Sequence, residues 1–242
     1  RFFVAASNIR GGVAYISGQD LEHIRVLRLK KGETFTLCDG NGTDYLCRLT
    51  DTKDGAACAE ILEKYQSEGE PSVKCSVFAA YSKGDKLDVV VQKCVELGAA
   101  SVIAFPSKRC VSKPDALAAQ RKVIRWQKIA EEAAKQCGRG TIPRVAAASS
   151  FESAVDSAGK AEVPLFLYES ERNLNFRSVM ERVSLCRSYS IFTGPEGGFE
   201  PAEAKYAAEQ GMLSVSLGPR ILRCETAPVC ALTAVMLMTG NL

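Results

Sequence analysis

Two loops rich in glycine, proline and charged side chains hold the residues of this sequence that are best suited to chemistry. One follows the apolar run at residues 191–193 and reads Gly194-Pro195-Glu196-Gly197-Gly198. The other reads Leu217-Gly218-Pro219-Arg220-Ile221-Leu222-Arg223-Cys224-Glu225-Thr226. Glycines let a ligand approach backbone N–H and C=O groups closely, and prolines stiffen the chain around them. The pattern favours a stiff backbone cradle for a ligand, although plain tight turns fit the spacing equally well. A phosphate-binding loop fits poorly, because no Lys-Ser or Lys-Thr pair follows the glycines.

Alternating strands and helices must position these loops. Apolar runs predict strands at residues 73–81, 101–105, 164–168, 189–193 and 213–217. The segments between and after them predict helices at residues 85–97, 115–137, 201–210 and 226–238. This alternation is typical of an α/β fold with a mainly parallel sheet covered on both faces. Ligands of such sheets bind where loops leave the carboxyl ends of strands, and both glycine loops begin at such ends.

A different pattern, of short strands and turns, occupies the N-terminal part of the chain. Apolar runs at residues 34–38 and 45–49 flank the strong hairpin signals Asp39-Gly40 and Asn41-Gly42. Residues 20–29 predict a short amphipathic helix. The polar segment 65–71 contains glycine and proline and is the best linker candidate. We therefore predict a small barrel domain at residues 1–68 and an α/β domain at residues 72–242.

Composition restricts the class of protein only loosely. The 242 residues are 46% hydrophobic and carry a net charge of +3, which neither requires nor excludes nucleic acid. Ten cysteines are scattered without a C-x-x-C pair, so reduced thiols are expected rather than a disulfide framework or a metal site. No basic and then apolar leader is visible, and the apolar C-terminal helix is too short to span a bilayer. We expect a soluble, cytoplasmic protein.

The two loops also resemble the motifs of a known family. Their sequences, including Phe199 and Ala227 at the ends, are similar to the RsmE family, which comprises small-subunit ribosomal RNA methyltransferases of the SPOUT superfamily. One departure is Cys224, which stands where the family usually has threonine. The resemblance extends along nearly the whole chain, through the motifs His23-Ile24-Arg25-Val26-Leu27-Arg28-Leu29, Lys83-Gly84-Asp85-Lys86, Gln92-Lys93-Cys94-Val95-Glu96-Leu97-Gly98 and Arg125-Trp126-Gln127-Lys128-Ile129-Ala130-Glu131-Glu132-Ala133.

The resemblance implies a fold, a reaction and an assembly. The α/β domain would carry a deep trefoil knot formed by the chain after Gly194, preceded by a PUA-like, OB-like β-barrel that binds RNA. The enzyme would methylate N3 of a specific uridine in small-subunit ribosomal RNA, either free or in the assembled subunit. It would form a homodimer through the C-terminal domain, with a site completed by both chains. The apolar residues around much of helix 226–238 give this assembly modest independent support.

The resemblance also implies a cofactor site for S-adenosylmethionine, the methyl donor. Acidic Glu196 could favour the cationic sulfonium nearby, or could simply pair with a local N–H group. Gly197→Val should abolish binding, because the side chain would fill ligand space and forbid a positive φ. The residues implied in cofactor binding are Gly194, Pro195, Glu196, Gly197, Gly198, Leu217, Gly218, Ile221, Leu222 and Thr226.

The charged residues of the second loop are the catalytic candidates for the implied reaction. Methylation of N3 requires removal of its proton or stabilisation of the anion on the flanking carbonyl oxygens. Arg223 is the first choice for stabilising that anion, and Arg220 is better suited to holding a phosphate. Glu225 could act as a base, although a carboxylate at that position is more typical of a helix-dipole partner. Thr226 is more typical of a helix N-cap than of a catalytic hydroxyl.

Basic residues in separate segments are candidates for contact with RNA phosphates. We expect Arg25 and Arg28 in the small barrel, and Lys108 and Arg109 in a loop of the α/β domain, to bind RNA. Trp126 is expected in the core or at a dimer contact rather than as a platform for a base. Two alternatives stay open: an RNA-binding module without catalysis, and methylation of transfer RNA by another branch of the superfamily.

Overall fold

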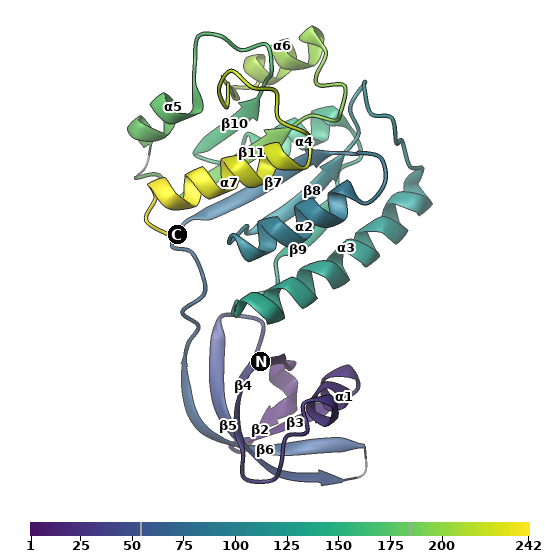
Figure 1. Ribbon diagram of the computed structural model, residues 1–242, viewed down its shortest axis with the longest axis vertical. Helices are drawn as coiled ribbons and strands as arrows, with labels where there is room; N and C mark the ends of the chain where they lie inside the picture. The colour runs from purple at the N-terminus through teal and green to yellow at the C-terminus, as the bar shows by residue number, and fades with distance from the viewer. Residues whose placement is uncertain (54, 184) are drawn as a thin grey trace. The chain divides into compact units, whose positions relative to one another are not determined.

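The computed structural model describes residues 1–53, 55–183 and 185–242. These residues form two compact units, which Figure 1 colours from purple at the N-terminus to yellow at the C-terminus. The first unit contains residues 1–70 and 134–142, and the second contains residues 71–133 and 143–242. Residues 134–142 thus belong to the first unit, although they lie far along the chain.

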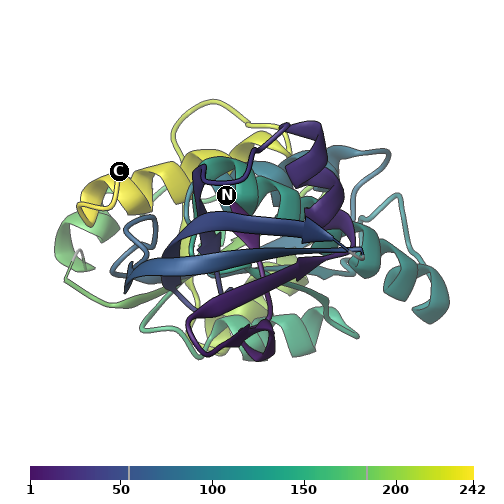
Figure 2. The same ribbon diagram turned by 90° about the horizontal axis from the view of Figure 1, so that it is seen from below.

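The first unit is a curled sheet in which almost every strand pairs antiparallel with its neighbours. The strands follow the order β1-β4-β5-β6-β3-β2, and only β1 and β4 pair in parallel. The long strands β5 and β6 are the most extended ribbons of this unit in Figure 2. Its elements are β1 (Phe2–Phe3), η1 (Ala6–Asn8), β2 (Ile9–Arg10), β3 (Val13–Ser17), α1 (Gln19–Val26), β4 (Thr34–Cys38), β5 (Thr43–Lys53) and β6 (Ala56–Gln66).

The hairpin predicted in this unit is confirmed, and two boundaries differ from the prediction. Strands β4 and β5 pair across the turn, in which Gly40 and Gly42 adopt positive φ of 75° and 89°. Helix α1 ends at Val26, and Arg28 beyond it takes a left-handed φ of 53°. Strand β6 continues to Gln66, because its residues stay paired with β5. The first two residues of the expected linker are therefore part of a strand.

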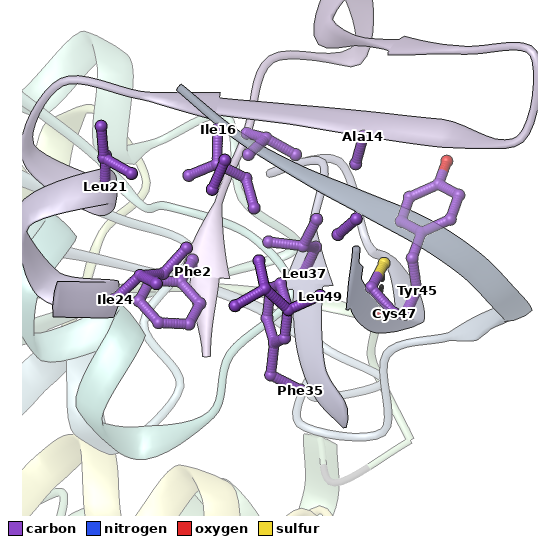
Figure 3. Close-up of a cluster of buried hydrophobic side chains, with 13 residues drawn as sticks. Phe2, Ala14, Ile16, Leu21, Ile24, Phe35, Leu37, Tyr45, Cys47 and Leu49 are labelled. Atoms are coloured by element: carbon purple, nitrogen blue, oxygen red, sulfur yellow. Dashed lines mark hydrogen bonds between the residues drawn. The ribbon is translucent and has the colours of Figure 1, made fainter. Parts of the chain in front are cut away.

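Alternating side chains of these strands make the core of the first unit (Figure 3). Phe2, Ile16, Leu37 and Leu49 are almost fully buried. The ring of Phe2 meets that of Phe35 edge to face, with centroids 5.6 Å apart. Period-two alternation places such residues on one face of a strand, so the curled sheet encloses them.

A carboxylate in the first unit binds residues 134–142. Glu70 accepts hydrogen bonds from Arg139 Nη2 at 2.7 Å and from the backbone N–H groups of Gly140 and Thr141 at 2.9 and 3.0 Å. Burial alone would raise the pKa of Glu70, but the hydrogen bonds and charge of Arg139 outweigh it and hold that pKa below its ordinary value. This buried ion pair ties two distant chain segments into one unit.

The second unit is built on a sheet in which every strand pairing is parallel, as predicted. The strands follow the order β12-β10-β11-β7-β8-β9. Helices α2 and α7 pack together against β7 on one face, and α4 packs against β7 and β8 on the other (Figure 1). The elements are β7 (Lys74–Ala80), α2 (Lys86–Glu96), β8 (Ser101–Phe105), α3 (Ala116–Cys137), β9 (Arg144–Ala147), α4 (Phe151–Ala158), β10 (Val163–Leu167), α5 (Phe176–Val183), β11 (Ser188–Thr193), α6 (Pro201–Glu209), β12 (Leu213–Val215) and α7 (Thr226–Met238).

Stacked aromatic rings fix the first glycine loop to this sheet. Phe199, directly after the loop, is buried and lies 4.3 Å from Phe166 of β10 between ring centroids. The ring of Phe192 in β11 lies 5.9 Å from Phe199 and 4.2 Å from Phe105. Because Phe199 is anchored in the core, residues 194–198 are held at the carboxyl end of β11.

Candidate cofactor and methyl-transfer site

The loops after β10, β11 and β12 surround one cavity of about 1000 Å³. Lys86, the first residue of α2, also contributes to its lining. The structure brings all three catalytic candidates to the cavity: Arg220, Arg223 and Glu225. Thr226 is not among the lining residues. The other nine residues expected to bind the cofactor all line the cavity, namely Gly194, Pro195, Glu196, Gly197, Gly198, Leu217, Gly218, Ile221 and Leu222.

The first loop needs glycine at a different position from the one we expected. Gly198 has a φ of +67°, and a Cβ built there would lie 2.0 Å from Glu169 Oε1. Gly197 does not take a positive φ, and a Cβ there would meet Arg109 Cβ at 3.1 Å. Of the two reasons given for Gly197→Val, the forbidden positive φ was therefore wrong, and the loss of ligand space stays a prediction. In the second loop, Gly218 has the left-handed φ, at +112°.

The second loop leads directly into α7. The carbonyl of Arg223 accepts the N–H groups of Thr226 and Ala227, both at 2.9 Å, and starts the helix. Thr226 is the first helical residue and Glu225 precedes it, so the expectation that Thr226 is the N-cap was wrong by one position. The side chain of Ile221 is 84% exposed, and Arg220 and Arg223 are exposed as well. Their guanidinium groups are therefore accessible to a substrate.

A lysine and two carboxylates form a charged cluster at the cavity. Lys86 Nζ lies 2.9 Å from Glu196 Oε1 and 4.0 Å from Glu225 Oε2. The N–H of Lys83 also donates to Glu196 Oε1, at 2.9 Å. Burial raises the pKa of Glu196, but the Lys83 hydrogen bond and the Lys86 ammonium outweigh it and keep that pKa below its usual value. Glu196 is therefore ionised and already paired within the protein.

Cys224, which stands where the family usually has threonine, still supplies a hydrogen-bond donor. Cys224 Sγ donates to Glu225 Oε2 at 3.2 Å. Burial, with the neighbouring carboxylate, raises the pKa of the Cys224 thiol to about 12, so it stays protonated near neutral pH. Burial also raises the pKa of Glu225, but hydrogen bonds, including that from Cys224, and nearby positive charges bring it below the ordinary value. A carboxylate with a lowered pKa is a weak proton acceptor.

Two parts of the cavity wall were missed from the sequence. Lys86 was visible in the motif at residues 83–86, but nothing local pointed to its carboxylate partners. The segment after β10, which contains Glu169 and Glu171, follows a strand end just as the glycine loops do. The rule that ligands bind at the carboxyl ends of strands could have included that segment.

The four residues expected to bind RNA fall into both units. Arg25 and Arg28 belong to the first unit, where Arg25 pairs with Glu22 at 2.6 Å. Lys108 and Arg109 belong to the second unit, and both are exposed. Arg109 Nη1 donates to the carbonyl of Gly197 at 3.1 Å. This basic loop therefore contacts the first glycine loop directly.

Two other expectations, for Trp126 and for the cysteines, are answered by side-chain placement. Trp126 is buried and donates from Nε1 to Asp88 Oδ1 at 2.8 Å, so it is a core residue and not a platform for a base. The ten cysteines of the sequence are all free thiols. Among residues 1–53, 55–183 and 185–242, no cluster of potential metal ligands occurs. No helix in the described ranges is both long and apolar enough to cross a membrane.

Comparison with known families and structures identifies the class of protein. Residues 69–236 match the model of an RNA methyltransferase domain, and residues 16–62 match that of an RNA methyltransferase PUA domain. A crystal structure of a ribosomal RNA small subunit methyltransferase E from Neisseria gonorrhoeae, bound to S-adenosyl methionine, superposes with a TM-score of 0.84 at 30% identity, covering 98% of this chain and 96% of that one. A putative methyltransferase from Legionella pneumophila, in complex with the same cofactor, gives 0.85 at 28% identity, covering 97% and 96%. The chain has the domains and the fold of an RNA methyltransferase.

Curated relatives narrow this class to one family. Ribosomal RNA small subunit methyltransferase E of Bacillus subtilis is 35% identical over 230 residues, which cover 93% of this chain and 90% of that protein. The protein of the same name from a Synechocystis species is 32% identical, covering 97% of this chain and 76% of the relative. The chain belongs to the ribosomal RNA small subunit methyltransferase E family.

Proposed function

We propose that this protein transfers a methyl group from S-adenosylmethionine to N3 of a specific uridine in small-subunit ribosomal RNA. The cavity at the carboxyl ends of β10, β11 and β12 supports this most directly. Its walls offer backbone groups of the glycine loops, and no Lys-Ser or Lys-Thr pair follows those glycines as in a phosphate-binding loop. S-adenosylmethionine carries no phosphate, so this lining suits it. When bound, the cofactor supplies an activated methyl group on a cationic sulfur.

Arg223 and Arg220 are proposed to act on the RNA. Both are exposed and line the cavity. The guanidinium of Arg223 would stabilise the anion that develops on the uracil carbonyl oxygens as N3 loses its proton. Arg220 would hold a neighbouring phosphate. Glu225 is better suited to positioning Lys86 and Cys224 than to removing a proton, because its pKa is lowered.

The proposal extends to RNA binding, location and the knot. Phosphates of the ribosomal RNA, free or in the assembled subunit, would be contacted by Arg25, Arg28, Lys108 and Arg109. We propose the cytoplasm as the location of the reaction. Ser216, just before the second glycine loop, pairs in parallel with Asn175 beyond β10, and its N–H donates to the carbonyl of Leu174 at 2.9 Å. We also propose the trefoil knot that the family implies, formed by the chain after Gly194.

A homodimer through α7 is also proposed. Leu232, Val235 and Met236 are buried within the chain, and Val229 and Met238 are half-buried. On the remaining circumference Leu237 is 62% exposed and Cys230 is exposed, so the helix still presents apolar surface. Sedimentation at micromolar concentration should give the mass of a dimer, and a monomeric mass would contradict this part. Mixing a Gly197→Val chain with an Arg25→Ala/Arg28→Ala chain should restore activity if two chains share one site.

The reaction is tested with the purified protein and ribosomal subunits from cells that lack this modification. Mass spectrometry of the digested RNA should show one uridine methylated at N3, only when S-adenosylmethionine is present. Calorimetry with the cofactor alone separates this enzyme from an RNA-binding module without catalysis. Absence of any binding heat at millimolar cofactor would favour the binding module, and methylation of transfer RNA instead would favour another branch of the superfamily.

A further inference from the structure

Four glutamates line the cavity, and three of them are engaged within the protein. Glu171 Oε1 accepts the backbone N–H groups of Arg172 and Asn173 at 2.9 and 2.7 Å, and so shapes its own turn. Glu196 is bound by the Lys83 N–H and the Lys86 ammonium, and Glu225 by the Cys224 thiol. These carboxylates hold the walls of the cavity together.

The fourth carboxylate, that of Glu169, differs from the others. Within the described part of the chain it accepts no hydrogen bond and forms no ion pair from its carboxylate. It is half-buried in the segment that follows β10. An acceptor that is partly removed from water and left without a donor is costly unless a ligand supplies one.

The Glu169 carboxylate lies next to Gly198, where the absence of a β-carbon leaves room for it. The Cβ that glycine lacks would lie 2.0 Å from Glu169 Oε1 and 2.7 Å from its carboxyl carbon. The side chain therefore lies directly over the left-handed glycine of the first loop. The segment after β10 thus places the Glu169 carboxylate in space that a side chain at Gly198, after β11, would otherwise fill.

We propose that Glu169 accepts hydrogen bonds from the ribose hydroxyl groups of the bound cofactor. This rests on the proposed function, because it assumes that a nucleoside occupies the cavity. A carboxylate is the usual protein acceptor for a ribose diol at the carboxyl end of a parallel sheet. The cationic parts of the cofactor are less suitable partners, because Arg172 Nη1 binds the carbonyl of Glu169 at 2.9 Å and brings a positive charge to this segment.

Calorimetry on the full chain tests this with three ligands: S-adenosylmethionine, S-adenosylhomocysteine and an S-adenosylhomocysteine analogue without ribose hydroxyls. Glu169→Ala should bind the first two about 10- to 150-fold more weakly than the wild type, the range expected for losing a hydrogen bond to a charged group. It should bind the deoxy analogue as the wild type does. Glu209→Ala is the matched control for a change of charge, since Glu209 ends α6 outside the cavity lining, where it pairs with Lys205 at 3.8 Å.

Each other outcome decides against the inference. A larger loss for S-adenosylmethionine than for S-adenosylhomocysteine would place Glu169 at the sulfonium. An equal loss for the deoxy analogue would show a general disturbance of the cavity. Unchanged affinity in a folded variant would mean that Glu169 does not touch the cofactor, whereas a wild-type protein that binds none of the ligands would contradict the proposed function itself. If Glu169→Ala fails to fold, the isosteric Glu169→Gln should still show a weaker but parallel loss for the two natural ligands.

Discussion

Replacing Gly198 by alanine should weaken cofactor binding in addition to weakening the fold. The new Cβ would collide with Glu169 Oε1 at 2.0 Å, and the φ of +67° disfavours any side chain. The left-handed backbone costs about 1–2 kcal/mol for a residue with a β-carbon. That cost should lower the melting temperature by roughly 2–8 °C, at about 2–4 °C per kcal/mol for a chain of this size.

The effect on binding comes from the displaced carboxylate. If Glu169 can no longer reach the ligand, the loss of a charge-assisted hydrogen bond is worth about 1.5–3 kcal/mol. At about 1.4 kcal/mol per factor of ten, S-adenosylmethionine should bind roughly 10- to 150-fold more weakly. Isothermal titration calorimetry measures that change, and thermal unfolding of the free protein measures the cost to the fold.

Gly211→Ala is the matched control for backbone strain. Gly211 has a similar φ of +83°, an added Cβ there meets no atom within 4 Å, and it lies in the turn between α6 and β12, outside the cavity lining. It should lose stability to the same extent but bind the cofactor normally. Wild-type affinity in folded Gly198→Ala would refute the reasoning about this site, and an equal loss of affinity in Gly211→Ala would attribute it to the fold.

Three further perturbations test other parts of the structure. Glu70→Gln should destabilise the protein at neutral pH and progressively less in acid. Because the folded protein lowers the pKa of Glu70, its carboxylate stabilises the fold fully above the ordinary pKa, and this stability is lost as the pH falls through the pKa of the folded state. Thermal unfolding from neutral pH downward measures the difference in stability between wild type and variant, and a difference that stays constant with pH would contradict this. Trp126→Phe should lower the free energy of unfolding by about 1–3 kcal/mol, because it removes the indole hydrogen bond to Asp88 of α2. Denaturant unfolding measures this loss, and an unchanged midpoint would argue against that bond. Arg109→Ala should weaken binding of both cofactor and RNA, because Arg109 donates a hydrogen bond to the carbonyl of Gly197. Lys108→Ala should weaken RNA binding alone and reduce the slope of its salt dependence by about one unit. Identical effects of the two variants on cofactor affinity would contradict the role of the Arg109 contact.

The sequence by itself was sufficient for elements whose signals are local. Strand β8 at residues 101–105 and helix α7 at residues 226–238 begin and end where their patterns predicted. Period-two alternation, helical periodicity and turn residues act over a few neighbours, so they can be recognised without knowing the fold. The glycine loops were located for the same reason, and most of their residues line the cavity. By contrast, the elements β9, α4 and α5 were missed, although the capping box of Ser150 and Ser153 and the amphipathic pattern of α5 were local signals that could have revealed the two helices.

Only the tertiary structure decided which distant groups meet. The sequence did not show that β12 pairs with β10 rather than with β11, which comes before it in the chain, and this order brings three strand ends around one cavity. It named Gly194, Gly197 and Gly198 alike as glycines that permit unusual dihedral angles, whereas in the fold only Gly198 of these three takes a positive φ, next to Glu169. It left Glu196 as a possible partner of the cofactor sulfonium, whereas in the fold the Glu196 carboxylate forms an ion pair with Lys86 of helix α2. Each of these contacts joins residues far apart in the chain, so the energy that selects it comes from burial and charge in the folded protein and leaves no mark on local sequence.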